Sequence, residues 1–488
     1  MHQLFYYRVL SIIVLFCGLG VIKPSHASTH LPTKNLRPII AKIEEQIQKD
    51  IQKKRIPGCA VAIVYRNEIV YVNGFGYRTV GRQEKIDGDT VFQLGSVSKP
   101  VAATLASILE NKGMLTFEDP INYYLPNFSL NSVQPPSALK IKHVLSHSTG
   151  VPRGGFNQMI ETHVPFTQIL NTLKNTPVRT SVGRRYDYNN AMYSVISEVT
   201  KSATQLSFSD ALHLNLLQPL KMTRTSATYE GLLSTDNRAS PHTRGKRGAL
   251  IPCGTYSNGY YSVAPAGGIN STARDMATFL KAQMGGYPHV LSHRALMRIQ
   301  TPQISTNNTL HAVNGPRNLT KNAYYGLGWR IVDFANQKMV FHGGWLKGFK
   351  NFVAFVPEQS IGIVVLQNGE TKFSSNIAVK FFELFFDVPQ KRTRKELLMP
   401  VSAARTLKAK TAKNVKNTKK LTRSLKKAPY LNRKPLCKPK KTMVIHRKPA
   451  NTPSIPRKMA AKKPITNVQI VKRSAQVVKR QLVKRNVP

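Results

Sequence analysis

The chain has 488 residues, enough for more than one domain, and its formal net charge at pH 7 is +49. Hydrophobic residues make up only 41% of it, which argues against a protein that is packed throughout its length. Residues 391–488 contain 31 of the 72 lysines and arginines and a single acidic residue, Glu396, so most of the excess charge belongs to one terminal segment.

Residues 1–27 are typical of a secretion signal. Arg8 precedes the apolar run 9–22, and the triplet SHA at 25–27 puts small residues at the two positions that a signal peptidase inspects. We therefore expect cleavage after this triplet and export to the periplasm or cell envelope. An uncleaved anchor and lipidation at Cys17 are the alternatives that the sequence leaves open.

Three cysteines follow this segment, namely Cys59, Cys253 and Cys437, and an odd number cannot form a complete disulfide framework. Cys59 lies in an apolar run and is expected to be a buried small hydrophobe. It could pair with Cys253 in an oxidising compartment, but the sequence does not supply the distance that a disulfide needs. Because no His/Cys cluster has zinc spacing, we expect neither a metal nor another cofactor.

The first third of the chain alternates between helix and strand. Isoleucines at helical spacing predict an amphipathic helix over 36–53, which a Pro-Gly pair ends. The apolar runs 59–65 and 68–75, separated by a polar pair, predict a β-hairpin. A helical pattern returns over 97–115, where Gly113 closes it.

Residues 120–300 are dense in turn residues and are expected to be mostly helix and loop, with a helix over 275–284. Strands return late, as short apolar runs at 338–341, 349–356 and 361–367. A final aromatic helix is predicted over 374–386. Strands at both ends that enclose a helical middle predict one sheet built from distant segments, and a functional site commonly forms at such a junction.

The strongest chemical signal is the tetrad SVSK at 96–99, within FQLGSVSKP. Residues three apart on a helix share a face, so the Lys99 amine can reach the Ser96 hydroxyl. A serine needs an adjacent base to become an effective nucleophile, and a lysine serves only if desolvation or nearby positive charge lowers its pKa. Taken alone, the tetrad is better explained by a helix cap with a solvated lysine.

Two later motifs change this interpretation: YNN at 188–190, and HGG at 342–344 within FHGGWLKGF. In order and separation, the three motifs resemble those of the serine penicillin-recognising enzymes, which include class C β-lactamases, D-alanyl-D-alanine carboxypeptidases and related esterases and D-aminopeptidases. The resemblance covers residues 36–388. Further segments similar to this family are HVLSHSTGVP at 143–152, AGGINSTARDMATFL at 266–280, YGLGWRI at 325–331 and VPEQSIGIVVLQN at 356–368.

The resemblance implies a β-lactamase/transpeptidase-like fold of the mixed α/β (α+β) class, with an antiparallel sheet flanked by helices and an inserted all-α region. The expected organisation is a signal peptide at 1–27, a serine hydrolase domain at 28–390 and a Lys/Arg-rich tail at 391–488. We predict that the tail is disordered, because it cannot bury enough apolar surface to offset the cost of ordering the chain.

The resemblance also assigns catalytic roles. Ser96 would attack the substrate carbonyl and become acylated, and Lys99 would accept or relay its proton. Tyr188, as a phenolate or a hydrogen-bonded phenol, would assist acylation and activate the water that deacylates the enzyme. The neighbouring charge of Lys99 is expected to favour the ionised phenol, because an opposite charge lowers its pKa.

The predicted substrate-binding residues are Asn190, His342, Gly344 and Trp345. Asn190 would orient the substrate amide, and His342 occupies the place that is Lys in class C β-lactamases. The backbone N–H of Trp345, with that of the nucleophile, would form the oxyanion hole. Gly344 and its neighbour Gly343 would let the substrate approach the strand closely, since no Cβ intrudes.

The histidine at position 342 decides the expected activity. As a partial, titratable charge it anchors a carboxylate more weakly than a lysine would, and carboxypeptidases and esterases of the superfamily often have it. We therefore expect an exported acyl-enzyme hydrolase of D-amino-acid peptides, esters or β-lactams, most of all a D,D-carboxypeptidase. A class C-like β-lactamase or an esterase is the alternative.

The basic tail predicts anionic partners, because a polycation binds them through counterion release. An acidic envelope polymer or a membrane surface suits an exported protein. Nucleic acid is a weaker match, since the tail lacks interleaved aromatic residues. The sequence leaves two alternatives open. The tail could be solvated and have no dedicated partner, or the protein could be non-catalytic and bind the envelope or nucleic acid through this tail.

Overall fold

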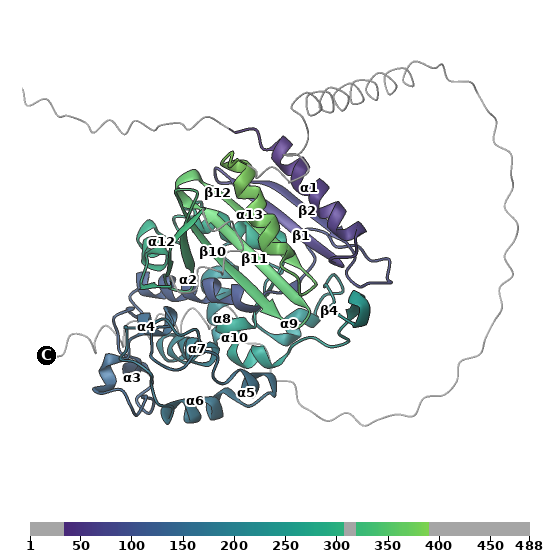
Figure 1. Ribbon diagram of the computed structural model, residues 1–488. Helices are drawn as coiled ribbons and strands as arrows, with labels where there is room; N and C mark the ends of the chain where they lie inside the picture. The colour runs from purple at the N-terminus through teal and green to yellow at the C-terminus, as the bar shows by residue number, and fades with distance from the viewer. Residues whose placement is uncertain (1–33, 307–318, 390–488) are drawn as a thin grey trace, which may run out of the picture.

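Figure 1 shows a computed structural model of the chain, which describes residues 34–306 and 319–389. The predicted signal peptide at 1–27 and basic tail at 391–488 lie outside the described residues. Within these two ranges, no helix combines the length and the apolar character needed to cross a membrane. The same part of the chain contains no group of three or more His, Cys, Asp or Glu side chains that could hold a metal ion.

An eight-stranded antiparallel sheet forms the centre of the fold, in the order β2-β1-β12-β11-β10-β9-β8-β7 (Figure 1). Its strands are β1 (Gly58–Tyr65), β2 (Glu68–Gly76), β7 (Ile304–Ser305), β8 (Thr320–Tyr325), β9 (Arg330–Phe334), β10 (Gln337–Leu346), β11 (Phe349–Val356) and β12 (Ile361–Gln367). The N-terminal hairpin thus pairs with the last strand, with Ile63 opposite Ile363. The prediction of one sheet built from distant segments is confirmed.

Helices cover both faces of this sheet. On one face lie α1 (Arg37–Gln52) and α13 (Phe373–Phe385), and on the other α2 (Ser98–Asn111), α11 (Ala273–Gln283) and α12 (His293–Gln300). Alternate residues of β1 therefore enter two separate cores: Ala60, Ala62 and Val64 face α2 and α11, whereas Cys59, Val61 and Ile63 face α1 and α13. Burial on both faces explains why β1 is apolar at every position.

The α-rich region lies below the sheet in Figure 1. Its helices are α3 (Ile121–Tyr124), α4 (Ile141–Leu145), α5 (Asn157–Glu161), α6 (Phe166–Lys174), α7 (Asn190–Thr204), α8 (Phe208–Leu212), α9 (Tyr229–Leu233) and α10 (Ala264–Gly267). Two short ladders accompany them, β3 (Phe92–Gln93) with β6 (Asn270–Ser271) and β4 (His242–Arg244) with β5 (Leu250–Pro252). The inserted helical region is confirmed.

The helices and strands that the sequence predicted all form, with ends that shift by a few residues. Strands β7, β8 and β9 were not predicted. These strands are short or, like β8, mix exposed and buried positions. Neither regular alternation nor a continuous apolar run therefore identifies them in the sequence.

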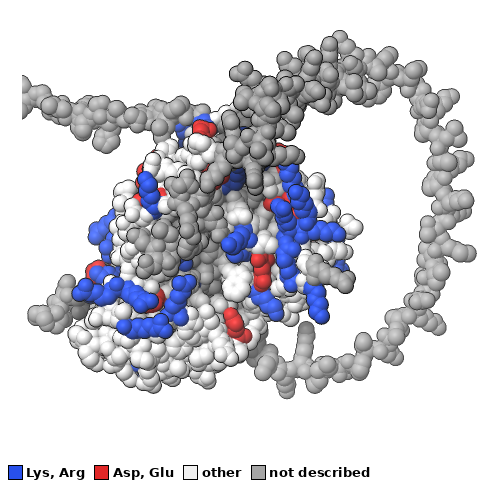
Figure 2. All heavy atoms as spheres, viewed as in Figure 1, with Lys and Arg blue, Asp and Glu red and all other residues white. Residues whose placement is uncertain are grey.

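Cys59 and Cys253 are both free thiols, and Cys59 is fully buried, as predicted. The disulfide between them that the sequence left open is therefore not formed. On the face shown in Figure 2, lysine and arginine side chains outnumber acidic ones and gather over the β1–β2 side of the sheet and around α4.

Candidate active site

Ser96 lies in a 3₁₀ turn, Gly95–Val97, that leads from β3 directly into α2. Among the side chains from Thr90 to Leu109, that of Ser96 alone is not buried. The turn requires a glycine at position 95, because its φ is +57° and a Cβ there would lie 2.9 Å from the backbone N and O of Trp345. The fold thus exposes one hydroxyl from an otherwise buried segment.

Lys99 follows one helical turn later and is 0% exposed. Its Nζ lies 3.4 Å from Ser96 Oγ, 2.7 Å from Asn190 Oδ1 and 2.8 Å from the carbonyl oxygen of Ala266. Burial, and then the charge of Arg330, lower the pKa of the Lys99 amine well below its ordinary value. A neutral amine can donate its two hydrogens to the two acceptors and direct its lone pair at the Ser96 hydroxyl.

The phenol of Tyr188 completes this cluster. Lys99 Nζ lies 4.5 Å from the centroid of the Tyr188 ring, and the Tyr188 hydroxyl is hydrogen-bonded to Ser96. Burial raises the pKa of this phenol, and that effect exceeds the lowering by Ser96 and Arg330. The expected ionised phenol is therefore not favoured, because burial disfavours the charged form of Tyr188 more than Ser96 and Arg330 favour it.

Asn190, the first residue of α7, supports Lys99 directly. Its Oδ1 accepts from Lys99, and its Nδ2 donates to Asn157 Oδ1 at 3.0 Å. Asn189 caps the same helix, since its side chain accepts from the backbone N–H of Met192. Orientation of the substrate amide by Asn190 stays a prediction, and holding the lysine is the contact that the structure adds.

His342 is 1% exposed and does not offer a charge to the cleft. Its Nδ1 donates to the carbonyl oxygen of Gly343 at 2.8 Å, so in the neutral ring Nε2 accepts from the Tyr325 hydroxyl at 3.0 Å. Burial, then the charges of Arg330 and Lys99, lower the pKa of His342 well below its ordinary value. Burial therefore disfavours the partial charge expected of this histidine, and both its ring nitrogens are hydrogen-bonded.

Strand β10 brings Gly344 and Trp345 to the nucleophile. Strand β9 pairs only with residues 337–341 of β10, so on that side the rest of β10 lies against the 3₁₀ turn instead. A Cβ at Gly344 would lie 2.0 Å from the carbonyl oxygen of Leu94, whereas one at Gly343 would find its nearest neighbour at 3.7 Å. Gly344 is therefore needed for the strand's contact with the nucleophile segment, a different reason from the expected approach of substrate.

Trp345 is 60% exposed, and its backbone lies beside Gly95, directly before the nucleophile. This arrangement suits the predicted oxyanion hole, which needs backbone donors next to Ser96. Asn351 of β11 fixes the same region, because its Nδ2 donates to the carbonyl oxygens of Gln93 and Leu94 at 2.9 and 3.2 Å. Sequence reasoning did not identify Asn351, which lies in an otherwise apolar strand.

Arg330 is a second residue that sequence reasoning missed. It is partly exposed, and its guanidinium carbon lies 5.6 Å from the ring centroids of both Tyr188 and Tyr325. The available signal was an arginine that begins an apolar strand directly after YGLGW. Arg330 therefore places a permanent positive charge beside Tyr188.

His147 has a structural role. It is 2% exposed, and its Nδ1 accepts from the backbone N–H of Asn189 at 3.3 Å. Its ring centroid lies 4.2 Å from that of Tyr188, so it supports the tyrosine from behind. A cleft of about 720 Å³ has Trp345, Tyr260 and Tyr256 among its walls.

Comparison with known proteins agrees with this geometry. The sequence model of the family described as Beta-lactamase matches residues 40–380. Protein flp of Staphylococcus aureus (strain NCTC 8325 / PS 47) is 22% identical over 335 residues, which make up 68% of this chain and 63% of flp. The Beta-lactamase of Escherichia coli (strain K12) is 23% identical over 350 residues, or 65% of this chain and 85% of that protein.

Solved structures show the same fold. The octameric penicillin-binding protein homologue from Pyrococcus abyssi superposes with a TM-score of 0.63 at 23% identity, over 71% of this chain and 77% of its own. A class C β-lactamase superposes with a TM-score of 0.57 at 21% identity, over 74% of this chain and all of its own. The chain spans 63% of the length of flp, so what flp does as a whole does not transfer directly. With a family match over more than half of its length and the three predicted motifs gathered around one serine, the chain belongs to the Beta-lactamase family.

Proposed function

We propose that this chain is a serine hydrolase that forms an acyl-enzyme on Ser96 and acts on D-amino-acid peptides as a D,D-carboxypeptidase. The observation that carries the proposal is the environment of Lys99. The buried amine has Asn190 and Ala266 as acceptors for two hydrogens and lies 3.4 Å from the Ser96 hydroxyl, so in its neutral form its lone pair is available to that hydroxyl, as a general base requires. A lysine with a purely structural role would be expected to meet a carboxylate or solvent.

In the proposed acylation, Ser96 Oγ attacks the peptide carbonyl while its proton moves to Lys99 Nζ. The carbonyl oxygen becomes an oxyanion, which the backbone N–H groups of Ser96 and Trp345 stabilise. The carbon–nitrogen bond then breaks, and the departing amine receives the proton that Lys99 took, with the neutral Tyr188 hydroxyl as relay. In deacylation, water attacks the acyl carbonyl and gives its proton to Lys99 or Tyr188. The bond between the acyl carbon and Ser96 Oγ then breaks, Ser96 Oγ takes this proton back, and the acid is released.

Arg330 supports a substrate with a free carboxylate. A carboxypeptidase must recognise the terminal carboxylate of the residue that it removes, and the buried, neutral His342 is poorly suited to that task. Arg330 is always charged, is partly exposed and lies beside Tyr188. We therefore assign the carboxylate anchor of the proposed reaction to Arg330 instead of His342.

Esterase and class C-like β-lactamase activities share the acylation step and differ in the leaving group, so they are the alternatives within this proposal. Two further proposals rest on the sequence outside the described residues. One is export to the periplasm or envelope. The other is binding of an acidic envelope polymer, a membrane surface or nucleic acid through the tail.

A substrate panel tests the proposal. Full-length protein is incubated with a peptide that ends in D-alanyl-D-alanine, with its L-alanyl counterpart, with an activated ester and with a β-lactam, and the products are measured. Release of D-alanine that Ser96→Ala abolishes, and that the exposed-serine control Ser234→Ala retains, supports the carboxypeptidase. Faster hydrolysis of the ester or lactam would favour the alternatives, and equal rates for Ser96→Ala would remove the serine hydrolase altogether.

A further inference from the structure

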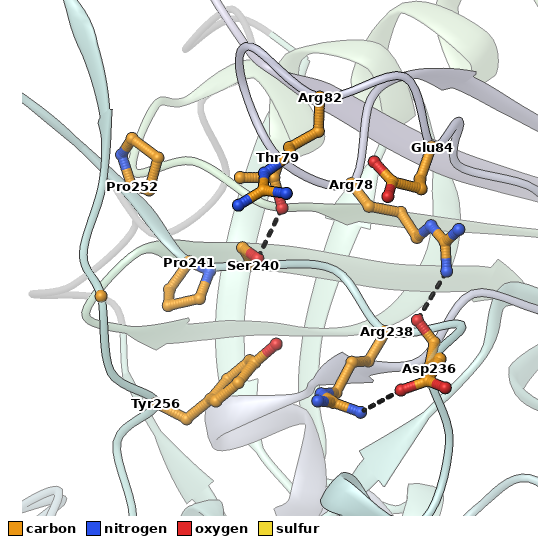
Figure 3. A pocket seen from close by; sticks show the side chains of 11 residues that line it. Arg78, Thr79, Arg82, Glu84, Asp236, Arg238, Ser240, Pro241, Pro252 and Tyr256 are labelled. Atoms are coloured by element: carbon orange, nitrogen blue, oxygen red, sulfur yellow. Dashed lines mark hydrogen bonds and ion pairs between the residues drawn. The ribbon is translucent and has the colours of Figure 1, made fainter. Parts of the chain in front are cut away.

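Figure 3 shows the walls of a second cavity, of about 610 Å³. Tyr256 lines both spaces, so one side chain forms the border between them. The cleft in turn includes Trp345, whose backbone adjoins the nucleophile segment. A substrate long enough to pass Tyr256 would therefore reach this second cavity with its far end.

Three arginines, Arg78, Arg82 and Arg238, line this cavity together with two acids, Glu84 and Asp236. Arg238 is paired with the Asp236 carboxylate at 3.5 Å, and that carboxylate is fully exposed to solvent. Arg78 Nη1 donates instead to the main-chain oxygen of Asp236, at 2.5 Å, so its charge has no counterion in that contact. Two guanidinium charges thus face one remaining acid, Glu84.

The two remaining guanidinium groups have unused donors. Arg78 Nε is buried and has no hydrogen-bond partner among the described residues. Arg82 is exposed, and its side chain makes no hydrogen bond or ion pair within the part of the chain that the structure describes. In Figure 3 the Arg82 guanidinium extends into the cavity toward Thr79 and Ser240, which are hydrogen-bonded to each other at 2.7 Å. A buried donor without a partner is costly, so this cavity is suited to an acceptor.

We propose that this cavity binds an anionic group, a carboxylate or a phosphate, at the far end of the acyl part of the substrate. Guanidinium groups are matched to both anions, since their planar N–H donors reach two oxygens at once. The inference rests on the proposed acyl-enzyme function and adds a substrate class to it: acyl groups with a second negative charge, distant from the bond that is broken.

Kinetics with matched substrates test the inference. Activated esters share one leaving group, and their acyl chains, of graded length, end in a methyl, a carboxylate or a phosphate group. At the length that reaches the cavity, wild type is expected to prefer an anionic ester. Arg82→Gln should lower the anionic-to-neutral ratio of kcat/KM about tenfold. Arg82→Lys should retain part of the preference for the anionic ester. The control Arg294→Gln, at an exposed arginine on α12, should leave the ratio at its wild-type value. An unchanged ratio for Arg82→Gln at every length overturns the inference.

A binding measurement separates this inference from the hydrolase itself. The full-length Ser96→Ala protein is titrated with malonate and with inorganic phosphate, and NMR follows the Nε–H resonance of Arg78, assigned by its loss in Arg78→Lys. A saturable shift that weakens in Arg82→Gln supports the cavity even if no ester is hydrolysed, and the anion that saturates first identifies the group bound. A resonance that does not move, or that moves equally in Arg82→Gln, overturns the inference whatever the activity.

Discussion

Replacement of Lys99 by methionine tests the neutral amine on which the mechanism depends. In the folded protein the pKa of Lys99 lies well below 10.5, because the amine is buried and near Arg330. In the unfolded chain it returns to about 10.4. Between these two values the unfolded state binds one more proton than the folded state, so wild-type stability rises with pH by about 1.4 kcal/mol per unit. Below the folded-state pKa both states are protonated, and the slope disappears.

Lys99→Met removes this titration. The difference in unfolding free energy, wild type minus variant, should therefore grow by about 1.4 kcal/mol for each pH unit inside the window. The variant leaves Asn190 Oδ1 and the Ala266 carbonyl without a donor, which changes its absolute stability but not the slope. Urea unfolding at several pH values measures the difference, and Lys201→Met, at an exposed lysine of α7, should show no such slope.

A flat difference between wild type and Lys99→Met would refute the reasoning, since it would mean that the amine keeps its proton in the folded state. Acylation gives an independent reading of the same group. Its rate should rise with pH through the folded-state pKa of Lys99, level off above it, and fall to the background in Lys99→Met.

Three further changes have distinct expected results. Gly344→Ala places a Cβ 2.0 Å from the Leu94 carbonyl oxygen, so it should lower the free energy of urea unfolding by about 1–3 kcal/mol and abolish labelling of Ser96 by a fluorescent penicillin or fluorophosphonate. Gly343→Ala, whose Cβ would find its nearest neighbour at 3.7 Å, should do neither. Equal effects of the two variants would contradict the strand contact. Tyr188→Phe keeps the ring beside Lys99 and loses the hydroxyl, so stopped-flow acylation should slow by about 10²- to 10⁴-fold, and an unaltered rate would exclude the phenol as relay. Arg330→Gln removes a charge that lowers the pKa of Lys99, so the pH profile of acylation should move to higher pH. Because the same variant removes the proposed carboxylate anchor, KM should rise more for a peptide with a free carboxylate than for its amide. An unchanged pH profile would contradict the electrostatic role.

Much of this fold is readable from the sequence because most of its elements are strongly patterned. Strand β1 is apolar at every position since both its faces are buried, and α1 carries its isoleucines at helical spacing. Strand β8 escaped prediction because its exposed and buried residues do not alternate regularly. Helical spacing brought Lys99 to Ser96. The convergence of this pair with Tyr188 followed from the resemblance to a family, since no local pattern joins residues so far apart.

What the sequence could not supply was burial of the charged and titratable groups. A partly charged His342 was expected from the residue type, and the charge of Lys99 was expected to favour the ionised form of Tyr188. Burial disfavours the charged form of both residues. Arg330 went unnoticed for the related reason that an arginine at a strand end is ordinarily solvated. Its position beside the rings of Tyr186, Tyr188 and Tyr325 appears only when β8, β9 and the segment before α7 are assembled.

The most direct test of the three-residue site is to locate the adduct. Full-length protein is labelled with a fluorescent penicillin or fluorophosphonate, digested, and analysed by tandem mass spectrometry. We expect a single modified peptide with the label on Ser96, and no adduct in Lys99→Met within the time that labels wild type. A label on any other residue, or labelling of Lys99→Met at the wild-type rate, would contradict the account.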